Sequence, residues 1–60
     1  MNTQLITLRK KKNLTQAEVA KALSISRAYY GMIENNQRAP SLAVAKKIAD
    51  YFNTRIEDIF

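Results

Sequence analysis

Cysteine and histidine are both absent from this chain of 60 residues. Their absence excludes disulfide bonds, the usual zinc sites and any nucleophile paired with a histidine, because each of these needs a thiol or an imidazole. No run of about 18 apolar residues is present, so we expect no membrane-spanning segment. We therefore expect no enzyme activity, no metal and no cofactor. A disulfide-free domain of this size also fits the cytoplasm.

Glycine and proline are nearly absent, with one of each, whereas 47% of the residues are apolar. Because both residues interrupt regular structure, their scarcity predicts an all-α chain. Sixty residues suffice for one domain with a single small core. We predict five short helices in residues 1–60: four over 2–12, 15–23, 26–35 and 42–52, and a final turn after Thr54.

The last two of these segments carry their own start signals. Ser41 is placed to cap the helix over 42–52. The apolar face of that helix would comprise Leu42, Ala45, Ile48, Ala49 and Phe52. Thr54 and Glu57 have the spacing of a capping box, in which each side chain bonds the backbone N–H of the other residue.

Residues 15–35 have the layout of a helix-turn-helix, two helices joined by about three residues. Thr15 and Glu18 form another capping box, and Ser26 is placed to cap the second helix. Ala20 is small, as a close crossing of two helices requires. The outward face of the second helix would carry Arg27, Ala28, Gly31 and Met32, with Tyr29 at its flank. The small residues on this face would let the helix approach a partner closely.

Charge is unevenly distributed along the chain. Residues 1–47 carry nine basic and two acidic side chains, whereas residues 48–60 carry one basic and three acidic ones. This pattern is expected when one face of a domain meets a polyanion.

These features together resemble the Cro and phage-repressor-type helix-turn-helix family over residues 5–60. The matching segments are Leu14-Thr15-Gln16, Glu18-Val19-Ala20, Ser26-Arg27, Ile33-Glu34, Pro40-Ser41-Leu42 and Ile48-Ala49. The resemblance implies a five-helix domain that binds double-stranded DNA, with residues 26–35 as the recognition helix in the major groove. It further implies a transcriptional regulator, expected to be a repressor that binds a palindromic operator as a homodimer.

The resemblance also implies roles for individual positions. Base contacts would come from Ser26, Arg27, Ala28 and Met32. Phosphate contacts would come from Gln16, Tyr29, Asn35, Gln37 and Arg38. Arg9 and Glu34 match a pair that forms an internal salt bridge between the first helix and the end of the recognition helix. Ser24 and Asn36 stand where the family often has glycine, so both are expected at positive φ.

The C-terminal end is apolar and mildly acidic, which would keep it away from DNA. We expect a dimer contact there, formed by Val44, Tyr51, Ile59 and Phe60. The alternative function is a protein-interaction module, such as an antitoxin-like partner with only weak DNA binding. Exposed apolar side chains at Ile6, or at Ile59 and Phe60, would favour that alternative. No membrane and no small-molecule ligand is expected as a partner.

Overall fold

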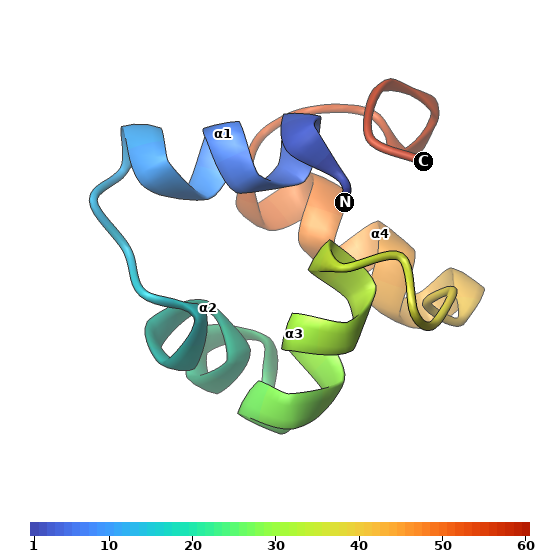
Figure 1. Cartoon of the computed structure of the whole chain (residues 1–60). Coiled ribbons are helices and arrows are strands. Elements are labelled where there is room, and N and C mark those ends of the chain that lie inside the picture. The colour runs from blue at the N-terminus through green and yellow to red at the C-terminus, as the bar shows by residue number, and fades with distance from the viewer.

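Four α-helices and one 3₁₀ turn make up the computed structural model, which describes all 60 residues (Figure 1). The helices are α1 (Thr3–Lys11), α2 (Gln16–Leu23), α3 (Arg27–Glu34) and α4 (Leu42–Tyr51), and the turn is η1 (Ile56–Asp58). Both termini lie near the start of α1, far from the turn that joins α2 to α3 (Figure 1). The prediction of an all-α chain is confirmed. None of the helices combines the length and apolarity that a membrane span needs.

The fifth predicted helix is a single 3₁₀ turn without a side-chain cap. Arg55 precedes it, so the capping box predicted for Thr54 and Glu57 is wrong. A helical segment this short is not stable by itself, and its geometry is set by packing. Side chains three residues apart eclipse in a 3₁₀ turn, which directs Ile56 and Ile59 to the same side. Both residues accordingly contact the core.

Each α-helix begins at a short polar side chain that accepts a hydrogen bond from a backbone N–H of the first turn. Thr15 and Glu18 form the predicted capping box, and Ser26 and Ser41 cap α3 and α4 as predicted. Asn2 caps α1 in the same way, accepting from the Leu5 N–H at 3.0 Å. Its side-chain Nδ2 also donates to the backbone oxygen of Ile59 at 3.0 Å. The cap of α1 therefore also holds the C-terminal turn.

Four residues adopt the left-handed conformation, and each lies just after a helix: Asn13, Ser24, Asn36 and Asn53, with φ of 55°, 59°, 58° and 55°. Asparagine tolerates this conformation, whereas serine has a greater steric cost. The predicted positive φ of Ser24 and Asn36 is confirmed. Ser24 ends α2 with its backbone N–H bonded to the Ala20 and Lys21 oxygens.

Replacing Ser24 with glycine is expected to raise the free energy of unfolding by about 0.5–1 kcal/mol, because glycine adopts positive φ without a Cβ clash. The matched control is Ala22→Gly on the exposed side of α2, where glycine should lower stability by about 0.5–1 kcal/mol. Urea unfolding followed by circular dichroism measures both. Loss of stability in both variants would contradict the assignment of strain to Ser24.

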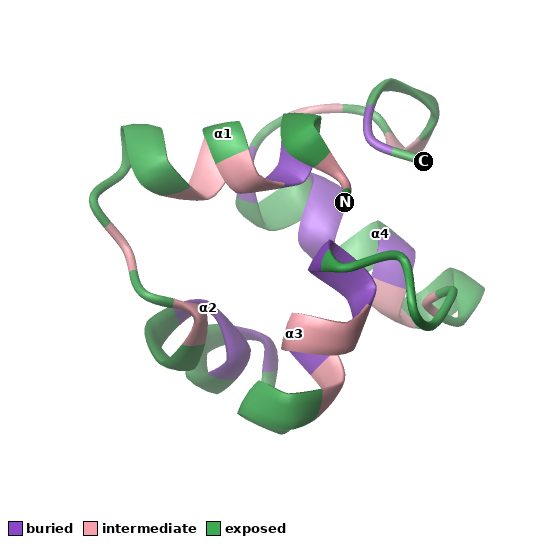
Figure 2. Cartoon of the chain, viewed as in Figure 1, coloured by how far each residue is buried: buried purple, intermediate pink, exposed green.

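Every element contributes to one apolar core, and the buried positions follow the inward stripes of the helices (Figure 2). Its members are Leu5, Val19, Ala20, Leu23, Tyr30, Ile33, Ile48, Ala49, Phe52 and Ile59. Leu42 is the exception to the predicted inner face of α4, because its side chain is 77% exposed. It lies in the first turn of α4, which projects beyond the neighbouring helices in Figure 1, and it is not among the apolar side chains that pack against the core.

Candidate nucleic-acid interface

The packing of α2 against α3 determines which face of α3 is free. Ala20 is 2% exposed, and the Ile25 N–H donates to its backbone oxygen at 3.0 Å, which closes the turn between the helices. On α3, Tyr30 and Ile33 are buried in the core. The opposite face of α3 therefore points outward, next to the first turn of α2.

The four predicted base-contact residues lie along this outward face. Ser26 and Arg27 are exposed at the start of α3, Ala28 is exposed, and Met32 is half-buried one turn later. Residues four positions apart share a helix face, which aligns Ala28 with Met32. The Ser26 Oγ accepts from the Tyr29 N–H at 3.0 Å, so its hydroxyl hydrogen remains available as a donor. The face thus presents one cation, one hydroxyl and two apolar side chains.

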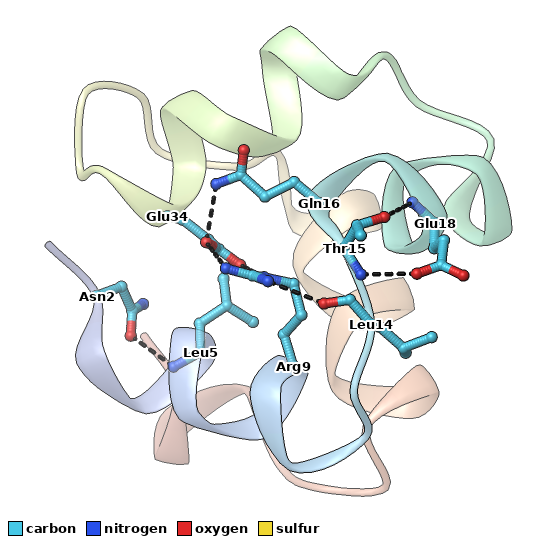
Figure 3. A network of polar contacts seen from close by, with 8 residues as sticks. All are labelled: Asn2, Leu5, Arg9, Leu14, Thr15, Gln16, Glu18 and Glu34. Carbon is cyan, nitrogen blue, oxygen red and sulfur yellow. Dashed lines mark hydrogen bonds and ion pairs between the residues drawn. The ribbon is translucent and has the colours of Figure 1, made fainter.

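Gly31 lies on the same side of α3, but part of the space beside it is filled by Gln16 from α2. A Cβ atom on Gly31 would lie 3.4 Å from the Gln16 Oε1, which is ordinary van der Waals contact. The Gln16 Nε2 donates to the Glu34 Oε1 at 3.0 Å (Figure 3). Gln16 therefore bridges the start of α2 and the end of α3, and a Cβ added at Gly31 would still fit beside it.

A polar network joins α1 to the end of α3 (Figure 3). The Arg9 Nε and Nη2 donate to the Glu34 Oε2 and Oε1 at 2.7 and 3.1 Å, and the Nη1 donates to the Leu14 oxygen at 2.9 Å. The side chains of Arg9 and Glu34 are 13% and 1% exposed. Arg9 and Glu34 are thus in the arrangement implied by the resemblance, and Gln16 is a third member that the sequence did not indicate.

Burial alone would raise the pKa of Glu34, because it disfavours the charged form. Hydrogen bonds from Arg9 and Gln16 outweigh it, so the pKa lies below the ordinary value of a glutamate. The Arg9 pKa is raised, chiefly by its hydrogen bond with Glu34. Both members of the pair are therefore charged at neutral pH.

The stability that Glu34 contributes is therefore fully present above the ordinary pKa of a glutamate, and is lost as pH falls through the lower folded pKa. The difference in unfolding free energy between the wild type and Glu34→Gln should shrink as pH is lowered from about 5 to 3. Urea unfolding at several pH values measures it. Glu18 also has a lowered pKa, but both proteins contain Glu18, so its contribution to the pH dependence cancels in the difference. A difference that does not depend on pH would contradict the charged assignment.

Tyr30 is a core residue, as the sequence predicts, and its hydroxyl is a buried side-chain atom without a hydrogen-bond partner. Burial raises the pKa of Tyr30 far above the ordinary value, and the Glu34 carboxylate adds to the effect. The hydroxyl therefore stays protonated and takes no part in the outward face.

The predicted phosphate-contact residues lie on either side of α3. Gln16 is half-buried at the first position of α2, whereas Asn35, Gln37 and Arg38 are exposed in the segment after α3. Tyr29 is half-buried. Its Oη accepts from the Ser41 N–H at 3.4 Å, and the Arg38 guanidinium carbon lies 5.7 Å from its ring centroid. The sequence placed Tyr29 at the flank of the face, but did not indicate either contact.

The four candidates for a dimer contact are not equally accessible. Tyr51 and Phe60 are 37% and 45% exposed, and Val44 is half-buried. Ile59 is only 6% exposed and belongs to the core, because the 3₁₀ turn directs it inward. The prediction of Ile59 as a surface contact is therefore wrong. Ile6, which the alternative function would expose, is half-buried.

A family described as helix-turn-helix matches residues 5–59. An uncharacterized HTH-type transcriptional regulator of Bacillus subtilis, YqaF, is 60% identical over 42 residues, which cover 70% of this chain and 55% of that protein. An uncharacterized HTH-type transcriptional regulator of Methanocaldococcus jannaschii, MJ0272, is 45% identical over 60 residues, covering all of this chain and 91% of that protein.

A phage protein is similar as well. The ImmF control region 10 kDa protein of Bacillus phage phi105 is 47% identical over 45 residues, which cover 75% of this chain and 50% of that protein. This chain therefore spans about half the length of the B. subtilis and phage relatives, and most of the archaeal one.

Proposed function

Because this chain belongs to the helix-turn-helix family, we propose that it is a DNA-binding transcriptional regulator whose α3 enters the major groove. The observation that carries the proposal is the outward face of α3, with Arg27, Ala28 and Met32 free while the inner face is buried. Arg27 has the fork geometry to bind guanine O6 and N7 together. Ala28 and Met32 can pack against a thymine methyl group. Ser26 supplies a further hydrogen bond to a base edge.

Phosphate contacts would fix the domain in this orientation. Gln16 opens α2, where the side chain and the unbonded backbone N–H groups of the first turn can bind one phosphate. The second set of contacts would come from the other side of α3, through Tyr29, Asn35, Gln37 and Arg38. The excess of basic residues in positions 1–47 supports association with a polyanion.

A homodimer would place two copies of α3 about 34 Å apart, in successive major grooves of a palindromic operator. Tyr51 and Phe60 would supply its exposed apolar contacts, with Val44 at the edge. The C-terminus lies away from the start of α3, so a dimer through Phe60 would leave the first turn of α3 free (Figure 1). Occupation of promoter DNA by such a dimer would repress transcription.

To test the proposal, duplexes that bind the protein would be selected from a randomised pool at two salt concentrations. We expect enrichment of a two-fold-symmetric sequence, bound with a salt slope that reflects several phosphate contacts. Failure to enrich any sequence, with only weak and salt-sensitive binding, would contradict the proposal. That outcome would favour the protein-interaction module instead.

Gly31→Ala separates stability from DNA binding. Alanine is the better helix residue and its Cβ fits beside Gln16, so the free energy of unfolding should rise by about 0.5–1 kcal/mol. Affinity for the selected duplex should nevertheless fall at least about fivefold, because a methyl group fills space between α3 and the groove. Urea unfolding and fluorescence anisotropy measure the two effects. Unchanged affinity would show that this position does not approach DNA.

A further inference from the structure

Arg38 is exposed in the segment after α3 and forms no ion pair with an acidic side chain. The ion pairs of the protein are Arg9 with Glu34 and Arg55 with Asp58. The neighbour that Arg38 does have is an aromatic ring, since its guanidinium carbon lies over Tyr29 at 5.7 Å from the ring centroid. We infer that Tyr29 is a positioning residue, which holds Arg38 in place for a DNA phosphate. This inference rests on the proposed function.

The position of Tyr29 suits this role. It lies in the first turn of α3, so its backbone moves with the base-contact residues. Its ring faces Arg38, and its Oη accepts the backbone N–H of Ser41, the residue that caps α4. One side chain of α3 thus contacts the segment over residues 35–41 at two places. The segment is thereby fixed to the helix that reads the bases.

A ring suits an arginine that must bind phosphate. Attraction to the face of an aromatic ring orients the cation, whereas a carboxylate would occupy its N–H donors and cancel its charge. The guanidinium keeps its donors for the two oxygens of a phosphate. Ordering a long side chain before binding also reduces the entropy lost when the complex forms. Tyr29 therefore acts on DNA affinity through Arg38, in addition to any contact of its own.

A double-mutant cycle on the selected duplex tests the inference. Arg38→Ala should lower affinity about tenfold and reduce the salt slope by about one. In a Tyr29→Leu background, which lacks the ring, Arg38→Ala should lower affinity less than about twofold. Tyr29→Phe keeps the ring, so in that background Arg38→Ala should retain most of its effect. Equal effects of Arg38→Ala in all three backgrounds would overturn the inference.

A second measurement needs neither a variant nor DNA. In the free protein, the Arg38 Nε–H group should have a higher heteronuclear NOE than that of Arg27, which is exposed and contacts no ring. Equal, low values for both would overturn the positioning role. If no duplex is enriched at all, the proposed function fails, and the NOE still reports whether Arg38 is held. The two failures are thereby distinguished.

Discussion

Replacing Glu34 with alanine is expected to lower the free energy of unfolding by about 3–5 kcal/mol. The variant would leave the Arg9 guanidinium, whose side chain is 13% exposed, without its carboxylate. It would also remove the acceptor of the Gln16 amide. A domain of this size has a total stability of roughly 3–9 kcal/mol. Much of the variant should therefore be unfolded at 25 °C.

The chain supplies a matched control for this substitution. Asp58 pairs with Arg55 at 3.0 Å, but the Arg55 side chain is 72% exposed and the Asp58 side chain is 48% exposed. Exposed ion pairs contribute little, so Asp58→Ala should cost less than about 1 kcal/mol. Urea unfolding followed by circular dichroism measures both variants. Similar losses for Glu34→Ala and Asp58→Ala would contradict the view that burial makes the Arg9–Glu34 pair sensitive.

Arg27→Ala is expected to lower affinity for the selected duplex about 5- to 150-fold, because a bidentate contact to guanine contributes about 1–3 kcal/mol of discrimination. Arg27 is exposed at the first position of α3 and the protein gives it no ion pair, so stability should not change. The preference for guanine at one base pair should be lost as well. Fluorescence anisotropy on duplexes with single base changes measures both effects.

Lys11→Ala is the control for charge in this experiment. Lys11 is an exposed cation at the end of α1, outside the proposed base contacts. Its loss should weaken binding slightly and equally on all sequences. If Arg27→Ala likewise lowered affinity for the selected and the scrambled duplexes by the same factor, the base contact assigned to Arg27 would be contradicted. Arg27 would then be a phosphate contact.

Local signals in the sequence predicted the starts and ends of the helices. Thr15, Ser26 and Ser41 cap their helices as predicted, because a cap depends only on the side chain and the next three residues. The positive φ of Ser24 and Asn36 was instead implied by the resemblance, because the family often has glycine at these two positions. The scarcity of glycine and proline predicted the all-α chain, and the caps at Thr15 and Ser26 located the helix-turn-helix within it.

Contacts between segments distant in sequence were harder to predict. Leu42 is exposed because α4 begins beyond the neighbouring helices (Figure 1), which no local pattern encodes. The contact of Gln16 with Gly31 and Glu34 depends on the crossing of α2 and α3. The link from Tyr29 to Ser41 likewise joins residues 12 positions apart. The candidate base contacts were predicted from helix periodicity and family resemblance. The interactions that hold Gln16 and Tyr29 beside them could be identified only from the structure.

The central claim is that the outward face of α3 binds DNA. Chemical-shift mapping tests this claim most directly. The uniformly ¹⁵N-labelled protein would be titrated with the selected duplex while its backbone amide signals are followed. We predict that the largest changes occur at Gln16, at Arg27 to Met32 and around Arg38, while Glu57 and Asp58 in η1 change least. Largest changes in η1 and the end of α4, with α3 unaffected, would contradict the account.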